Sequence, residues 1–181
     1  MESTDRGRVE LQLEHVSCLV GENLIKVHSE LNTGDEQRLL PINVSANNNI
    51  FCSVSSSSMV SMTGNSDMEE FKGMLTWNGN RNWYERIGSL WQVDSTYDDA
   101  VEDYDFEGWR EHWRDKSDSS ENGAVFGEAV FQAQSKTKPV SELRLTDLAL
   151  DETSEAIGTD GKNVGADWRR LPPNAIPPED E

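Results

Sequence analysis

Residues 42–52, Ile-Asn-Val-Ser-Ala-Asn-Asn-Asn-Ile-Phe-Cys, alternate apolar and polar side chains and then set Asn49 before a second apolar run. A period of two is typical of a strand with one buried face. The same pattern occurs 33 residues earlier, in residues 9–18, and again in residues 75–84, where Asn82 follows Asn49 by 33 positions. His15 falls one residue out of step with the two asparagines. The chain therefore contains a repeat of about 33 residues.

Each repeat carries a second short strand, in residues 24–28, 59–63 and 89–93, after a turn rich in Gly, Asn or Ser. Longer loops are expected between the repeats, over residues 30–40 and 65–73. A unit of two short strands cannot bury an apolar face alone, whereas stacked units can.

Stacking predicts that strands of successive repeats pair in parallel and that Leu11, Val44 and Trp77 fall into register as one core column. The side-chain amides of Asn49 and Asn82 can then hydrogen-bond along the stack. The alternative is an antiparallel sandwich whose strands merely resemble one another. The period favours an all-β fold, a short solenoid of about three to four coils.

The composition changes after residue 93. Residues 94–121 hold eleven acidic and three basic side chains, a net charge of 3 − 11 = −8. Within them Phe106, Trp109 and Trp113 stand at i, i+3 and i+7, one face of a helix, with Asp105 as its N-cap. We expect one α-helix, in an acidic insertion, that docks on the solenoid through these aromatic rings.

Four segments follow from these changes. Residues 1–93 are expected to be stacked coils, 94–121 the acidic insertion, 122–168 closing coils with a cap, and 169–181 a Pro-rich acidic tail. The tail holds four of the six prolines and ends in three acidic residues. We expect it to be extended and solvated.

Charge limits the classes of function. The 16 Lys and Arg stand against 34 Asp and Glu, which gives a net charge of −18. A free-standing nucleic-acid binder needs a basic face, which this acidic chain does not offer. An anionic membrane surface repels a chain with so large a negative charge. No apolar run is long enough to cross a membrane, so no membrane insertion is expected, and residues 1–5 do not resemble a signal peptide. The localisation stays open.

The two cysteines, Cys18 and Cys52, form neither a Cys-x-x-Cys pair nor a disulfide framework. They lie about one repeat apart, so they are expected to stack within the coil as buried small apolar residues. A disulfide is the alternative.

The second half carries a resemblance. Phe106-x-x-Trp109 is followed by Phe131, Leu143-x-Leu145, Ser154-Glu-Ala-Ile-Gly158 and Val164-Gly-Ala-Asp167. This order resembles the C-terminal turns and cap of bacterial right-handed parallel β-helix proteins of the pectate-lyase-like superfamily. The resemblance implies a right-handed parallel β-helix. Because that superfamily includes lyases, hydrolases, adhesins and modules without a known reaction, it does not fix a function.

The resemblance leaves two functions open. The first is a non-catalytic scaffold or binding module, the C-terminal part of a larger bacterial protein. The alternative is a fragment of a carbohydrate-active enzyme, a polysaccharide lyase or glycoside hydrolase, with its catalytic residues elsewhere. Members of the superfamily have more turns, so we expect upstream coils or another protein chain to cover the N-terminal edge. Self-assembly through that edge is a third hypothesis.

The sequence offers three kinds of candidate site. A glycosidase needs two facing carboxylates, and the outward acids Glu10 and Glu14 have no acidic partners on the next coils, so no catalytic residue is assigned. The aromatic residues Trp83, Tyr84 and Tyr97 are candidates for glycan binding by ring stacking; the competing interpretation places Trp83 and Tyr84 in the core. Calcium is the candidate metal, with oxygen ligands from acids of the insertion. Its candidate ligands are Asp99, Asp103 and Asp105. The competing interpretation of these acids is a solvated acidic loop. No other cofactor is expected.

Overall fold

The computed structural model describes residues 7–30, 39–53, 56–127, 142, 150 and 156–166. Within these residues the chain forms three four-stranded sheets and two helices. Eight of the nine strand pairs are parallel; the exception joins β9 and β10. The fold is therefore predominantly β, and the parallel pairing is inconsistent with an antiparallel sandwich.

The first sheet has the order β1 (Val9–Glu14), β4 (Ile42–Asn47), β7 (Leu75–Asn80) and β11 (Ser120–Asn122). Leu11 pairs with Val44, and Val44 with Trp77, which confirms the core column expected from the repeat. The second sheet contains β2 (Ser17–Val20), β5 (Ile50–Ser53), β8 (Trp83–Glu85) and β12 (Val125–Phe126). The third contains β3 (Ile25–Ser29), β6 (Val60–Gly64), β9 (Trp91–Ser95) and β10 (Ala100–Tyr104).

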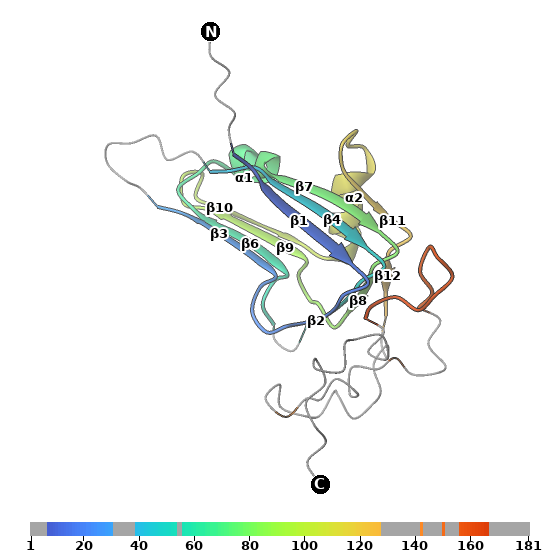
Figure 1. Ribbon diagram of the computed structural model, residues 1–181. Coiled ribbons are helices and arrows are strands. Elements are labelled where there is room, and N and C mark those ends of the chain that lie inside the picture. Colours follow the sequence, from blue (N-terminus) through green and yellow to red (C-terminus); the bar gives the residue numbers. More distant parts are fainter. Residues whose placement is uncertain are drawn as a thin grey trace.

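Each repeat contributes three strands, so the expectation of two was wrong. The chain bends between the first and second strands at His15, Asn48 and Arg81, which adopt left-handed φ angles of 52°, 56° and 54°. Such angles are uncommon outside glycine, and no single residue type marks them here. The bend moves the chain from the first sheet to the second, and a further turn brings it to the third (Figure 1).

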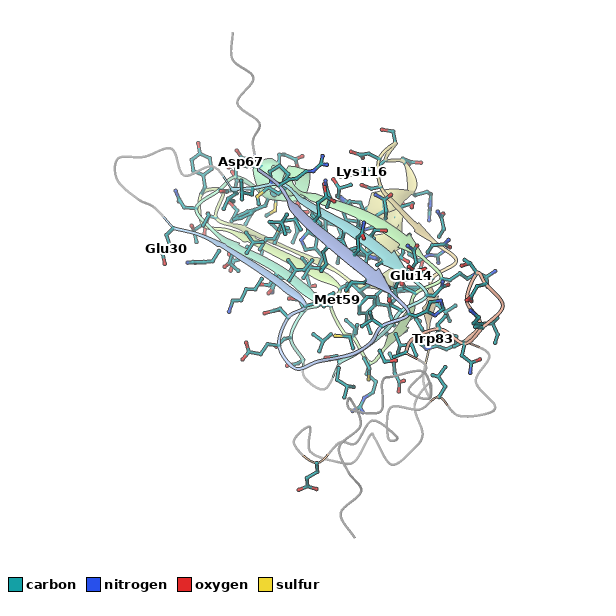
Figure 2. The ribbon with its side chains drawn as sticks, in the orientation of Figure 1. Glu14, Glu30, Met59, Asp67, Trp83 and Lys116 are labelled. Atoms are coloured by element: carbon teal, nitrogen blue, oxygen red, sulfur yellow. The ribbon has the colours of Figure 1, made fainter. Side chains whose placement is uncertain are left out.

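The core is formed by the inward faces of the sheets. Its largest fully buried side chains are aromatic, and they contact one another: the rings of Phe51 and Tyr84 stack within the second sheet with centroids 5.5 Å apart, and Phe51 meets Trp77 of the first sheet at 6.3 Å. Aromatic rings bury large apolar areas, so they dominate the stability of a core of this size. Figure 2 shows how densely side chains fill this part of the molecule, with Met59 among them.

The loop expected over residues 65–73 was wrong, because it contains helix α1 (Met68–Met74). The carboxylate of Asp67 caps this helix by accepting a hydrogen bond from the Glu70 N–H at 2.7 Å. Met68, Phe71 and Met74 lie on its buried face. Their spacing at i, i+3 and i+6 after an Asp is the signal for a helix that the interpretation as a loop overlooked.

Helix α2 (Phe106–Arg114) confirms the expected aromatic helix. Asp105 is its N-cap and accepts from the Gly108 N–H at 2.8 Å. Trp109 and Trp113 are buried, and Trp113 stacks on Trp91 with ring centroids 5.6 Å apart. Before α2, the acidic stretch forms β10, which pairs antiparallel with β9. Part of the expected insertion is thus a strand of the third sheet.

A second apolar cluster lies on the second sheet. Ile50 and Cys52 pack there against Ala156 and Val164. The Gly165 N–H donates to the Asn48 carbonyl at 2.6 Å, and Gly165 itself needs a φ of 75° to do so. Residues 156–166 therefore lie against the second repeat. Phe131, Leu143, Leu145, Ser154, Asp167 and the tail are outside the described residues.

Both cysteines are free thiols. Cys18 lies opposite Phe51, and Cys52 lies opposite Leu19, so the thiols do not stack in register. Burial raises the pKa of the Cys18 thiol. Among the described residues, no helix is long and apolar enough to cross a membrane.

Candidate functional site

A polar groove of about 660 Å³ lies on the outer face of the third sheet. It is formed by outward side chains of β3, β6, β9 and β10 and by the turns beside them. Hydroxyl and amide groups make up most of its lining. The lining residues are Asn23, Lys26, His28, Ser56, Ser57, Ser58, Ser61, Thr63, Ser89, Gln92 and Asp103.

Strand pairing sets four of these side chains in one row. Lys26 pairs with Ser61, Ser61 with Gln92, and Gln92 with Asp103. Because side chains alternate between the two faces of a sheet, residues paired in this way project from the same face. The neighbouring positions Val60 and Trp91 point into the core, where both are fully buried. A continuous polar row therefore crosses all four strands.

Hydrogen bonds hold several groove side chains in place. His28 Nδ1 and Thr63 Oγ1 are 2.9 Å apart, and the Asn23 amide donates to the Ser58 carbonyl at 2.6 Å. The Ser89 hydroxyl donates to the Asp103 carboxylate. These bonds join neighbouring strands and turns, so the groove is organised before any ligand arrives.

The groove is close to electrically neutral in a strongly acidic chain. Lys26 supplies one positive charge at the β3 side, and Asp103 supplies one negative charge at the β10 side. His28 lies beside Lys26 on the same strand, with its Nε2 3.8 Å from the Glu30 carboxylate. The site therefore offers hydrogen-bond donors at one end and a carboxylate acceptor at the other.

The aromatic residues predicted to bind glycans are not brought together. Tyr84 is fully buried, and it pairs with Phe51 as Trp83 pairs with Ile50, as the core interpretation expects. Tyr97 is 68% exposed in the turn after β9. That turn contacts the start of α1, because the Asp98 carboxylate accepts from the Met68 N–H at 2.6 Å. Figure 2 places Asp67, next to Met68, far from Trp83, so the three rings form no common platform.

The acids predicted to bind calcium have separate roles. Asp105 caps α2, Asp103 lies in the groove, and Asp99 occupies a left-handed position, φ 52°, in the turn before β10. In the part of the chain that the structure describes, no three His, Cys, Asp or Glu side chains are grouped as ligands of a metal ion. Calcium binding therefore stays a prediction, and no group of ligands among the described residues supports it.

The sequence interpretation also missed a partly buried carboxylate at the end of the core. Glu121 Oε2 accepts hydrogen bonds from Trp77 Nε1 at 2.5 Å and from Tyr84 Oη at 2.8 Å, and Trp109 Nε1 lies 3.5 Å from it. The Asn82 amide donates to Oε1 at 3.3 Å. Burial raises the pKa of Glu121, and these donors oppose that rise. The hydrogen-bond partners of Glu121 are side chains of the core, and this carboxylate does not line the groove.

The groove itself could have been found from one signal. Lys26, His28, Ser61, Thr63 and Gln92 are the outward positions of the second strand predicted in each repeat. The outward acids noted in the sequence, Glu10 and Glu14, belong instead to the first strand of a repeat. Glu10 on that other sheet contacts Arg8 and accepts from the Asn43 amide at 3.2 Å, as expected of a solvated face.

Comparisons with known proteins found no similar protein for this chain. It matches no protein-family model, and neither the curated proteins nor the solved structures contain a significant match.

Proposed function

We propose that the three sheets form a short right-handed parallel β-helix of the pectate-lyase-like kind. The chain passes from the first sheet to the second and the third, and it returns to the first about 33 residues later. Parallel crossover connections are right-handed in nearly all proteins, which supports the proposed hand. The ladder from Asn49 to Asn82, with an amide-to-carbonyl distance of 3.0 Å, supports the stacking.

We propose that this β-helix is a non-catalytic binding module and that its ligand, a glycan, occupies the groove on the third sheet. The observation that carries the proposal is the row of paired polar side chains across four strands. Sugars offer many hydroxyl groups, and each can exchange hydrogen bonds with amide, hydroxyl and carboxylate groups. A preorganised polar surface of this kind fits such a ligand.

The enzyme alternative needs a second catalytic group. Glycosidases use two carboxylates that flank the scissile bond, and the groove lining contributes one, Asp103. This supports binding over catalysis in the described residues. A carbohydrate-active enzyme with catalytic residues elsewhere remains the alternative, and release of reducing sugar from a bound glycan would favour it.

The test is a glycan array followed by titration of the hits. Gln92→Ala, in the middle of the row, is expected to weaken binding, whereas Gln12→Ala removes an exposed amide from β1 on the first sheet and should leave it unchanged. Equal losses in both variants would contradict the groove as the binding surface. An array without any hit would contradict the function.

We also propose that another polypeptide adds strands to the edges of β1, β2 and β3, supplied by upstream coils or by another chain. Each of these strands forms one edge of its sheet. Their inward residues are less buried than those of the next repeat. Val9 is 46% exposed while its partner Ile42 is 8% exposed, and Leu11 is partly buried while Val44 is 1% exposed. Unpaired edges of this kind invite strand addition.

Light scattering tests the self-assembly form of this proposal. If a second copy covers the edge, the mass rises with concentration above that of a monomer, and Leu11→Asp restores the monomer because it places a charge in the contact. Gln12→Ala, on the outward face of the same strand, serves as the control. A wild-type monomer at every concentration would exclude self-assembly and leave coils from other sequence as the partner.

A further inference from the structure

We infer that the groove accepts a linear, uncharged oligosaccharide that lies across β3, β6, β9 and β10. The inference rests on the proposed binding function and names the ligand class of the same site.

The dimensions of the row carry the first step. Neighbouring strands are about 4.8 Å apart, so the three steps from Lys26 through Ser61 and Gln92 to Asp103 span about 14 Å. That strand spacing is close to the length of one pyranose unit in an extended glycan. A chain of about three sugars placed along the row therefore meets a new polar side chain at each unit.

The charges carry the second step. Lys26 and Asp103 cancel within the groove, while the whole chain has a net charge of −18. Asp94 and Glu30 lie near the margin: Asp94 pairs with Thr63, and Glu30 contacts His28. A polyanionic glycan would meet a repulsive field around a groove that offers no excess positive charge. An uncharged glycan avoids this cost.

The ends of the row carry the third step. Lys26 has only hydrogen-bond donors, whereas the Asp103 carboxylate has only acceptors, one of them engaged by Ser89. The middle residues, Ser61 and Gln92, have both kinds of group. Hydroxyl and ring oxygens of the ligand therefore accept at the β3 end, and hydroxyl groups donate at the β10 end. Sugar hydroxyl groups both donate and accept, so the units of an uncharged sugar chain can satisfy the groups at both ends of the row.

The experiment is an NMR titration of the full chain with cello- and malto-oligosaccharides of increasing length, beside galacturonate oligomers of matched lengths. We expect a neutral series to bind, with an affinity that rises with length up to about three units and then levels. Galacturonate oligomers should bind at least about tenfold more weakly, and added salt should narrow the difference by screening repulsion.

Variants then locate the ligand. Lys26→Ala and Gln92→Ala are expected to weaken binding of the neutral oligomer by about tenfold and about fivefold, since each loses a hydrogen bond to the ligand. Gln12→Ala should bind as the wild type does.

Each outcome decides between the two claims. Tighter binding of galacturonate that weakens with salt would overturn the uncharged ligand and leave the groove in place. Binding of the neutral series that neither Lys26→Ala nor Gln92→Ala changes would place the ligand elsewhere and overturn the inference. If none of these oligomers binds but another glycan on the array does, the ligand class falls while the binding function stands.

Discussion

At the scale of single residues, Glu121 closes the polar ladder that runs through the stack. The Val16 N–H donates to Asn49 Oδ1 at 2.8 Å, the Asn49 amide donates to Asn82, and the Asn82 amide donates to Glu121. The ladder thus passes from a backbone amide through two side-chain amides to a carboxylate. Gly79 makes room for this carboxylate, because a Cβ there would lie 2.1 Å from Glu121 Oε2.

Because the pKa of Glu121 is raised, its contribution to the stability of the fold changes with pH. The folded state holds the proton more tightly than the unfolded state, so this residue contributes stability below its unfolded pKa that is lost as pH rises through the folded pKa. Glu121→Gln keeps the uncharged form. We expect the free energy of unfolding of the wild type to fall relative to that of Glu121→Gln as pH rises above about 4, the ordinary pKa of a glutamate.

Chemical denaturation at several pH values measures this difference, with Glu22→Gln, an exposed residue, as the control. The comparison with a variant is needed because His112 acts in the opposite sense. Burial lowers the pKa of His112 to about 4, so His112 costs stability as pH falls. A Glu121→Gln difference that stays constant with pH would contradict the prediction.

At the scale of elements, the aromatic face of α2 is the main contact between the helix and the sheets. Trp109 is fully buried against Trp77 and lies edge-on to Trp113 at 5.2 Å. We expect Trp109→Ala to lower the free energy of unfolding by about 3–5 kcal/mol, because the cavity adds to the lost apolar burial.

Urea denaturation measures this loss. Glu111→Ala, on the exposed face of the same helix, should change the stability by less than about 0.5 kcal/mol. Similar losses in the two variants would mean that α2 contributes little packing to the core.

The repeat predicted those elements whose pattern is local. Alternation placed the strands of the first sheet and their register, and the spacing of Phe106, Trp109 and Trp113 placed α2. The repeat could not predict the bend at His15. The bend residue is a histidine, an asparagine and an arginine in the three repeats, so no single residue type marks the left-handed angle. The reversal into β10 was missed for a similar reason: an alternating strand carries no mark of its direction.

The groove was missed because it is a property of four strands together. Lys26 and Asp103 are 77 residues apart in the sequence, and only the register of the third sheet brings them into one row. The predicted aromatic residues are separated for the opposite reason: Trp83 and Tyr84 are adjacent in sequence, yet alternation sends neighbouring side chains to opposite faces of the second sheet.

At the scale of the whole molecule, the net charge of −18 opposes compactness. We expect the melting temperature to rise between about 0.05 M and about 0.5 M sodium chloride as repulsion is screened. Differential scanning calorimetry measures this rise.

A variant with Asp99→Asn and Asp115→Asn, at exposed positions, has a net charge of −18 + 2 = −16 and should respond less to salt. A melting temperature that does not change with salt would show that charge repulsion does not limit stability.

The strand β10 gives the molecule two unlike ends. At the β3 end of the third sheet an incoming coil meets a strand that runs in the common direction, whereas at the other end it meets β10, which runs the opposite way. A coil wound in the common direction would pair in parallel with β3 and antiparallel with β10. Open-ended, head-to-tail growth needs two surfaces that match each other. The two ends of the third sheet do not match in this way, so β10 disfavours growth of the chain into a fibre.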